Sequence, residues 1–335
     1  MHFAPTDEQA QLQEIARDFL AANPSATWEQ VVEEQGWPAI AIPESLGGFG
    51  FGLVELVLIA EELGRALAPV PLLSHTLASR SVLCMGTASQ QERWLPQLAA
   101  GLRATSASGS FRATRTGDRW RLVGRAPRVL DGADAQLVVV NTDQGSFVVE
   151  QADFAAEPQP ALDPSRPLAA LTVDCEVAED QRLAQHGVAT ALGAGWVLLA
   201  GEATGVAEAC LDESVSYAKI RVQYGQPIGS FQAIQHKCAD MLLLVESARS
   251  AAWYAAWAHD AAADDAELAA RTARAYAGDA AFRCAAENIQ IHGGVGFTWE
   301  HTAHRYFKRA RADQALLGAP ASHRAQIAEH LLGAL

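Results

Sequence analysis

Apolar residues recur at helical spacing through the first hundred residues. Thr6 to Gln9 form a capping-box pattern that predicts a helix start, and the apolar positions that follow it keep a period near 3.6: Leu12, Ile15, Phe19 and Leu20. Further helical segments are predicted over Trp28–Gly36, Leu53–Leu67 and about Ser74–Ala100, with a glycine-rich loop at Gly47–Gly52. The first hundred residues are therefore predicted to be all-helical.

The pattern then changes to short segments of β-type composition. Breaks rich in Gly, Asp and Pro separate these segments, which are Trp120–Val123, Gln136–Val140, Ser146–Val149 and Ala169–Val173. From Leu183 the helical period returns in four alanine-rich stretches, at about 187–222, 231–262, 264–291 and 319–334. Small residues allow helices to pack closely, as in an antiparallel bundle.

This order predicts a mainly α protein with a small β-domain. We expect an N-terminal helical domain over residues 1–104, a central β-domain over 105–182 and a C-terminal helical bundle over 183–335.

Charge and cysteine usage narrow the classes of function. The chain has 39 acidic and 25 basic residues and a formal charge of -14, so phosphate backbones are repelled and nucleic acid is not an expected partner. Five widely spaced cysteines without a C-x-x-C pair indicate neither a disulfide framework nor a zinc knuckle. The N-terminus has no export pattern and no apolar run reaches ~18 residues, so we expect a cytoplasmic protein without a membrane partner.

Two segments of the C-terminal part carry candidate chemistry. Residues 221–241 read RVQYGQPIGSFQAIQHKCADM, and residues 290–297 read QIHGGVGF. Both could be plain helix-ending turns. Their chemical use would be anion binding, because an arginine matches a pyrophosphate, a glutamine amide bonds ribose or phosphate, and glycines let the backbone approach a flat cofactor.

Other chemistries fit the sequence less well. Gly48-Phe49-Gly50-Phe51-Gly52 lacks the preceding strand of a dinucleotide-binding turn. His292, His301 and His304 lack the spacing of a metal site, and no G-x-S-x-G elbow of a serine hydrolase occurs.

The two C-terminal segments resemble flavin-binding signatures of the acyl-CoA dehydrogenase family. Those signatures are R-x-x-F/Y-G-x-P-I-x-x-F-Q-x-x-Q-H-x-x-A-D-M and Q-x-x-G-G-x-G-F/Y. Residues 41–50 (AIPESLGGFG) and 61–65 (EELGR) also resemble N-terminal segments of that family. The resemblance covers nearly the whole chain and implies that family's fold, with a β-barrel-like central domain and a C-terminal four-helix bundle.

The same resemblance implies a function. The family binds FAD, removes an α-proton from an acyl-CoA with a glutamate and passes the β-hydride to the flavin. Each FAD lies across a subunit interface. Carried over position by position, the residues expected at the ADP end of FAD are Arg221, Tyr224, Gln232, Gln290, Gly293 and Gly294.

The chain departs from the family where the catalytic base should be. Leu317 takes the place of the usual glutamate, and the alternative position at the start of the bundle's first helix is Gly195-Trp196. The flavin-ring segments are also changed: Ser108-Gly109-Ser110 only partly matches one of them, and Pro127–Gly132 replaces W-I-T-N. The catalytic set of this chain is therefore expected to be empty.

Three hypotheses remain open. The first is a subunit of a heteromeric acyl-CoA dehydrogenase, resembling the α2β2 enzymes of actinobacteria, whose paralogous partner supplies the base and whose acyl-CoA substrate could be of a bulky steroid type. The second is a self-sufficient homo-oligomeric flavoenzyme that uses another base such as Glu202. The third is a catalytically silent scaffold.

Overall fold

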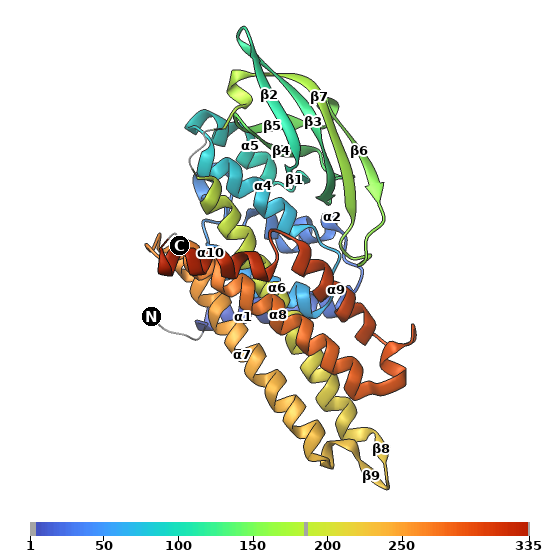
Figure 1. The fold of residues 1–335 in the computed structure, drawn as a ribbon. Helices are drawn as coiled ribbons and strands as arrows, with labels where there is room; N and C mark the ends of the chain where they lie inside the picture. Colours follow the sequence, from blue (N-terminus) through green and yellow to red (C-terminus); the bar gives the residue numbers. More distant parts are fainter. Residues whose placement is uncertain (1–4, 184–186, 334–335) are drawn as a thin grey trace. The chain divides into compact units, whose positions relative to one another are not determined.

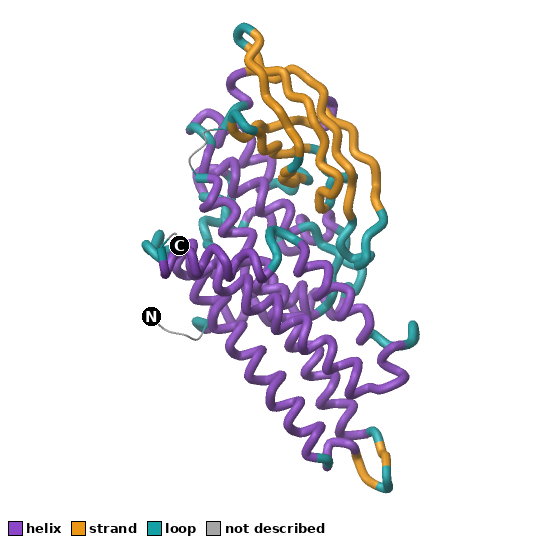
Figure 2. Tube along the Cα trace, viewed as in Figure 1, coloured by secondary structure: helices purple, strands orange, loops and turns teal. Residues whose placement is uncertain are grey.

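The chain folds into two compact units that interleave along the sequence. The computed structural model describes residues 5–183 and 187–333 (Figure 1). The helical unit comprises Met1–Ser25, Leu53–Ala68 and Trp196–Leu335, and the mixed unit comprises Ala26–Gly52 and Pro69–Gly195. Figure 2 shows helices in both units, whereas the longer strands belong to the mixed unit. The three-part division at residues 104 and 182 stays a prediction.

The helical unit is built from long helices and one short hairpin. Its elements are α1 (Asp7–Ala22), α3 (Leu53–Arg65), α6 (Val188–Ile220, from Trp196 onward), β8 (Val222–Gln223), β9 (Gln226–Pro227), η6 (Ile228–Ser230), α7 (Gln232–Asp260), α8 (Ala266–His292), η7 (Gly293–Phe297), α9 (Ala303–Ala315) and α10 (Pro320–Leu332). Among the described residues, none of the helices combines the length and the apolar character that crossing a membrane would require.

Helices α3 and α6 lie in unusually close contact. A Cβ atom added at Gly64 would lie 1.9 Å from the carbonyl oxygen of Glu202, and one added at Gly205 would lie 1.8 Å from that of Glu61. Any side chain at either glycine would force the two backbones apart. The E-E-L-G-R segment therefore has a structural use, because its glycine seats α3 against α6.

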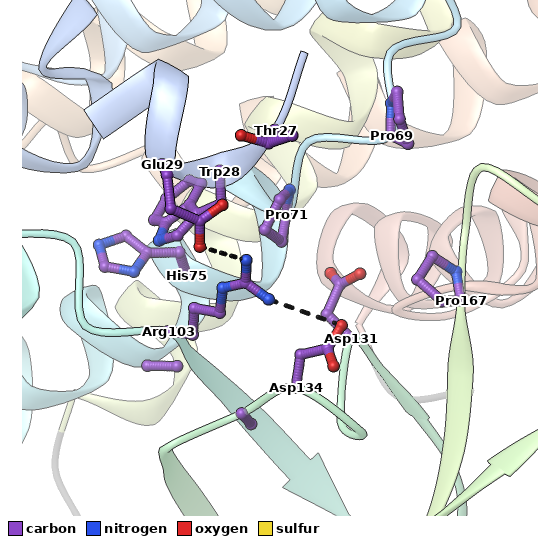
Figure 3. A pocket seen from close by; sticks show the side chains of 12 residues that line it. Thr27, Trp28, Glu29, Pro69, Pro71, His75, Arg103, Asp131, Asp134 and Pro167 are labelled. Atoms are coloured by element: carbon purple, nitrogen blue, oxygen red, sulfur yellow. Dashed lines mark hydrogen bonds and ion pairs between the residues drawn. The ribbon is translucent and has the colours of Figure 1, made fainter. Parts of the chain in front are cut away.

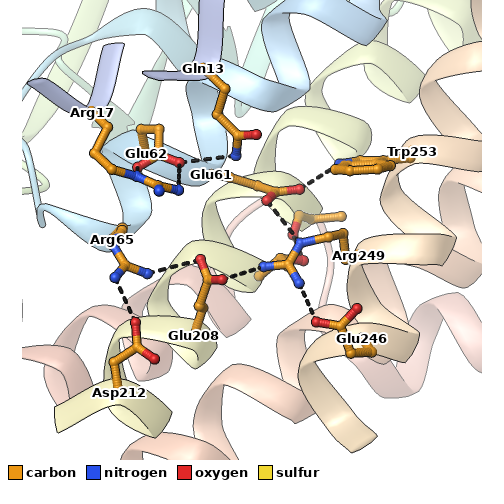
Figure 4. A network of polar contacts seen from close by, with 12 residues as sticks. Gln13, Arg17, Glu61, Glu62, Arg65, Glu208, Asp212, Glu246, Arg249 and Trp253 are labelled. Atoms are coloured by element: carbon orange, nitrogen blue, oxygen red, sulfur yellow. Dashed lines mark hydrogen bonds and ion pairs between the residues drawn. The ribbon is translucent and has the colours of Figure 1, made fainter. Parts of the chain in front are cut away.

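Polar side chains tie α3 to α6 and α7 beside this contact (Figure 4). Glu61 is 1% exposed, and its carboxylate accepts hydrogen bonds from Trp253 Nε1 at 2.6 Å and from Arg249 Nε at 3.2 Å. Glu208 lies 2.8 Å from Arg249 Nη2 and 2.9 Å from Arg65 Nη1. Burial outweighs these cationic and hydrogen-bonding partners and raises the pKa of Glu61 to about 7.

The mixed unit contains short helices and two sheets. Its helices are α2 (Trp28–Gln30), η1 (Val31–Gln35), η2 (Trp37–Ala39), η3 (Glu44–Leu46), α4 (Leu72–Met85), α5 (Ala88–Ala99), η4 (Gln151–Asp153) and η5 (Glu179–Gln181). Its strands are β1 (Ala104–Ser108), β2 (Ser110–Thr116), β3 (Arg119–Leu130), β4 (Leu137–Thr142), β5 (Gly145–Glu150), β6 (Phe154–Gln159) and β7 (Leu168–Ala178). The strand orders are β1-β4-β5 and β2-β3-β7-β6.

Strand β4 shows how the mixed unit is layered. Val138 and Val140 pack into a core shared with the four-stranded sheet, which contains Phe111, Trp120 and Leu171. Leu137 and Val139 point the other way, into a core with Trp94 of α5 and Val82 of α4. Because successive strand residues alternate between faces, the first four residues of β4, Leu137–Val140, are buried on both sides and are all apolar.

The structure corrects the predicted elements at three places. The helix expected over Ser74–Ala100 is two helices, because Gly86 ends α4 and Thr87 caps α5. Strands β1, β2 and β6 were not expected from the sequence. These strands are short, and many of their side chains are polar or exposed. Helix α9 was also missed, because its many arginines hide the narrow apolar face that contains Tyr306.

Glu61 predicts a pH dependence of stability. Its folded pKa of about 7 lies above the ordinary value of 4.5, so the folded state binds the extra proton, and this contribution is complete below about pH 4.5 and lost as pH rises through 7. The Glu61→Gln variant should flatten the fall in unfolding free energy between these pH values, by on the order of 1 to 3 kcal/mol.

Urea unfolding at pH 5, 6, 7 and 8 measures this difference. Glu329→Gln, an exposed change on α10, is the control and should retain the wild-type slope. If the unfolding free energy of Glu61→Gln falls as steeply with pH as that of the wild type, the raised pKa of Glu61 is contradicted.

Candidate functional site

The end of α6 leads into a hairpin that presents the first candidate segment. Arg221 follows the last residue of α6, and its backbone N–H donates to the carbonyl of Tyr217 at 2.9 Å. Tyr224 and Gly225 form the tip between β8 and β9, with φ values of 54° and 79°. Two successive positive φ values are typical of a two-residue hairpin turn. Tyr224 is 94% exposed, so the turn projects it into solvent.

The end of α8 presents the second candidate segment. Gln290 is exposed in the last turn of α8, and Gly293 leaves the helix with φ 64° and ψ -140°, a conformation that suits glycine. A Cβ atom added at Gly293 or Gly294 would meet nothing within 4 Å. The backbone of this turn is therefore open to a ligand.

Ring and backbone contacts bring these segments together. The ring of Tyr217 stacks on that of His292 with centroids 4.3 Å apart, so the end of α6 lies beside the end of α8. The N–H of Ile228 donates to the carbonyl of Arg221 at 2.8 Å, and α7 begins shortly afterwards at Gln232. The six candidate residues thus belong to one end of the helical unit.

All six candidate residues are exposed at this end: Arg221, Tyr224, Gln232, Gln290, Gly293 and Gly294. Within residues 5–183 and 187–333, the guanidinium of Arg221 forms no side-chain hydrogen bond or ion pair. An arginine left available, two glutamine amides and an open glycine turn are the donors that a pyrophosphate and a ribose require. The residues present therefore fit the ADP end of FAD.

Large apolar side chains lie exposed in or directly beside the same segments. Ile220 is 76% exposed, Phe297 80% and Trp299 84%. Clusters of exposed large apolar groups mark surfaces that bind another molecule. Phe297 and Trp299 were not among the candidate residues expected from the sequence, although the alternation of Val295, Phe297 and Trp299 after the glycine turn would have been a signal.

The turn around Leu317 is held by side chains that form hydrogen bonds with its backbone carbonyls. Leu317 has a φ of 52°, and its carbonyl lies 3.0 Å from both Trp196 Nε1 and His323 Nε2. Arg274, which is 0% exposed, donates Nη2 to the carbonyls of Asp313 and Leu316 at 2.6 and 3.0 Å. Burial lowers the pKa of Arg274 to about 10, so it stays charged near neutral pH.

The alternative base positions carry no available carboxylate. Gly195 is buried in α6, directly before Trp196. Glu202 is 0% exposed, and its Oε2 lies 3.2 Å from Nη2 of Arg309, whose Nε lies 3.3 Å from Oδ2 of Asp313. Breaking such a buried ion pair costs about 3 to 5 kcal/mol. This geometry disfavours Glu202 as a base that swings to a substrate.

The segment that replaces W-I-T-N borders a small charged pocket in the mixed unit (Figure 3). The pocket has a volume of about 250 Å³, and Arg103 in its wall pairs with Glu29 at 2.5 Å and with Asp134 at 3.7 Å. Asp131 also lines it and accepts a hydrogen bond from Ser74. Cofactor pockets are usually larger, from about 300 Å³, and mostly apolar.

The pocket also contains a buried histidine. His75 is 1% exposed beside Trp28, and burial lowers its pKa to about 4. Among the described residues, no group of three or more His, Cys, Asp or Glu side chains is arranged to hold a metal ion.

Comparison with protein families covers most of the chain. Residues 6–102 match the profile described as acyl-CoA dehydrogenase, N-terminal domain, and residues 186–332 match the one described as acyl-CoA dehydrogenase, C-terminal domain. Acyl-CoA dehydrogenase IpdE2 of Mycobacterium tuberculosis is 36% identical over 333 residues, which cover 94% of this chain and 95% of that protein. IpdE2 of Mycolicibacterium smegmatis is 35% identical over 295 residues, with 88% and 84% covered.

Solved structures share the fold. The ChsE4–ChsE5 complex from Mycobacterium tuberculosis matches with a TM-score of 0.91 and 27% identity over 100% of both chains. A Tcur3481–Tcur3483 steroid acyl-CoA dehydrogenase variant matches with a TM-score of 0.87 and 28% identity, with 97% of this chain and 98% of that chain covered. Butyryl-CoA dehydrogenase from Megasphaera elsdenii matches at 0.90 and 25%, with 99% and 100% covered. The predicted arrangement of helical, β and helical domains is confirmed.

Gly294, in the open turn, and Gly296, two residues later, should respond differently to an added side chain. Gly294→Val should change the free energy of unfolding by less than about 0.5 kcal/mol, because the new side chain meets open space. Gly296→Val should cost about 1 to 3 kcal/mol, because its Cβ would lie 2.8 Å from that of His292. Thermal and urea unfolding measure both, and equal losses would contradict the open turn.

Proposed function

Because the chain belongs to the acyl-CoA dehydrogenase family, which uses FAD, we propose that it is the base-lacking subunit of a heteromeric enzyme of that family. One observation carries the proposal: the residues suited to the ADP end of FAD are exposed at one end of the helical unit, while the base position is a leucine in a locked turn. In this proposal the chain completes the FAD site of a paralogous partner.

The chain's own residues would hold the cofactor's ADP end. The guanidinium of Arg221 would pair with the pyrophosphate, and the amides of Gln232 and Gln290 would form hydrogen bonds with ribose or phosphate oxygens. The N–H groups of the Gly293–Gly294 turn would be open to the same anion, since no side chain intervenes. Tyr224 offers a ring at the hairpin tip. When bound, FAD would accept the hydride that leaves the β-carbon of the acyl group.

Proton removal is assigned to the partner. Abstraction of an acyl α-proton needs a carboxylate within about 3 Å of the carbon, desolvated enough to be basic. Leu317 has no proton acceptor in its side chain, and Glu202 is already paired with Arg309. The partner subunit therefore contributes the base in this proposal.

Two similarities support a heteromeric assembly and a bulky substrate. A structure with a TM-score of 0.91 to this chain is a ChsE4–ChsE5 complex, and another close match is described as a steroid acyl-CoA dehydrogenase. We therefore propose an α2β2 assembly that desaturates a steroid-type acyl-CoA, with lipid catabolism as its setting.

Visible absorbance separates the proposal from its alternatives. The purified chain should be colourless alone and yellow when co-expressed with its paralogous partner. A yellow chain alone would indicate a self-sufficient flavoenzyme, and absence of flavin from both preparations would indicate a silent scaffold.

Arg221→Ala should release flavin from the co-purified complex. Loss of a charge-assisted bidentate contact of about 1.5 to 3 kcal/mol lowers FAD affinity by about 10- to 100-fold, without unfolding the chain. Arg112→Ala, which removes an exposed arginine of β2, is the matched control and should retain flavin. Flavin content is read from the absorbance ratio after gel filtration, and full occupancy in Arg221→Ala would reject the assignment.

Replacing the partner's base should abolish turnover. With this chain wild type, activity with an artificial electron acceptor should fall to background, because the chain has no carboxylate at Leu317 or Gly195. Leu317→Glu alone should not restore it, since the flavin-ring segments of this chain are also changed. Retention of about half the activity would instead show a competent site here.

A further inference from the structure

Three rings from three parts of the helical unit lie in contact beside the candidate ADP site. The ring of His292, the last residue of α8, lies 4.3 Å from that of Tyr217 on α6 and 4.2 Å from that of His301, which precedes α9. The planes of Tyr217 and His292 are 29° apart, which is a stacked arrangement. His292 is thus the central ring, and it is only 5% exposed.

Hydrogen bonds fix the orientation and tautomer of His292. Its Nδ1 lies 2.8 Å from the carbonyl oxygen of Asn288. Because a carbonyl only accepts, Nδ1 carries the hydrogen and Nε2 has none in the neutral ring. The Asn288 side chain is held in turn by Ser214 at 3.0 Å and by Glu213 at 2.9 Å.

The turn that follows rests on His292. A Cβ atom at Gly296 would lie 2.8 Å from the Cβ of His292, so η7 packs directly against this residue. On the other side of His292, the carbonyl oxygen of Tyr217 accepts a hydrogen bond from the backbone N–H of Arg221. A displacement of His292 would therefore move the glycine turn away from the arginine.

The surroundings favour the neutral ring. Burial is the largest cause that lowers the pKa of His292, and the neighbouring His301 adds to it. The carbonyl of Asn288 and the carboxylate of Glu213 act in the opposite direction but do not outweigh burial. Glu213, on α6, also accepts a hydrogen bond from Thr302 at 2.6 Å, so its charge is shared with that hydroxyl. Protonation would place a charge on a ring that is only 5% exposed and lies 4.2 Å from the ring of a second histidine, His301.

We propose that neutral His292 is a positioning residue that clamps the Gly293–Gly294 turn to the Arg221 end of α6, and that the ADP site weakens when this histidine becomes charged. The proposal rests on the proposed function for its ligand, FAD. Acidification then loosens the clamp and weakens flavin binding, although His292 itself need not touch the cofactor.

Flavin affinity against pH tests the clamp in the co-purified complex. The dissociation constant of FAD should rise about tenfold in the wild type between pH 7.5 and 5.5. His292→Phe preserves the ring that stacks on Tyr217 and does not titrate. This variant should bind FAD within about threefold of the wild type at pH 7.5, and its affinity should change less than about threefold on acidification.

Two further variants complete the series. His292→Ala should weaken binding at least tenfold at both pH values, because it removes the stack. His330→Phe, at an exposed histidine of α10, is the control and should keep the wild-type pH profile. A wild-type pH profile in His292→Phe, or wild-type affinity in His292→Ala, would overturn the proposal.

Hydrogen exchange separates this inference from the proposed function. The segment 288–302 of the chain should exchange faster at pH 5.5 than at pH 7.5 after correction for intrinsic rates, and His292→Phe should remove that difference. If no complex binds FAD at any pH, the proposed function fails while the exchange result still decides the clamp. The same pH dependence of exchange in the wild type and in His292→Phe would reject it.

Discussion

The close approach of α3 to α6 is the constraint on which the helical unit depends. Gly64 and Gly205 permit backbone contact, and the buried carboxylate of Glu61 beside them receives hydrogen bonds from Trp253 and Arg249 of α7. Helix α6 is thereby fixed against two neighbours. Because one helix spans Trp196 and Glu202 near its start and Tyr217 near its end, the same constraint positions the base region and the candidate ADP site.

The two ends of α6 are opposite in chemical character. Near Trp196, a buried arginine, an indole and a histidine saturate the carbonyls of the Leu317 turn. Near Tyr217, an available arginine and an open glycine turn face solvent. Saturated polar groups hold a structure in place, whereas exposed unpaired ones are available to a ligand. This contrast supports the proposal that this chain binds the ADP end of FAD while its partner supplies the catalytic base.

Buried charge in this chain serves the fold. Glu202, Arg309 and Asp313 form a closed set, and Arg274 ends on backbone carbonyls. In each case the charge is compensated inside the protein, as low-dielectric surroundings require. A glutamate on the right helix is therefore not enough to infer a base, since its partners decide whether it can act.

The sequence by itself determined the class of fold, the order of its parts and the family. Helical periodicity, glycine turns and the R-x-x-Y-G and Q-x-x-G-G segments are local features, and they predicted the ends of α6 and α8 from residues near one another in the chain. It could not predict β1, β2 and β6, because strands that are short or half exposed acquire their identity from the sheet they join.

Only the tertiary structure decided which distant groups meet. It paired Glu202 with Arg309, 107 positions away, and thus disfavoured a base that the sequence had left open. It also stacked Tyr217 on His292 and so joined the two candidate segments into one site. Ion pairs and ring contacts between residues far apart in the chain depend on how helices pack, and no local pattern records that packing.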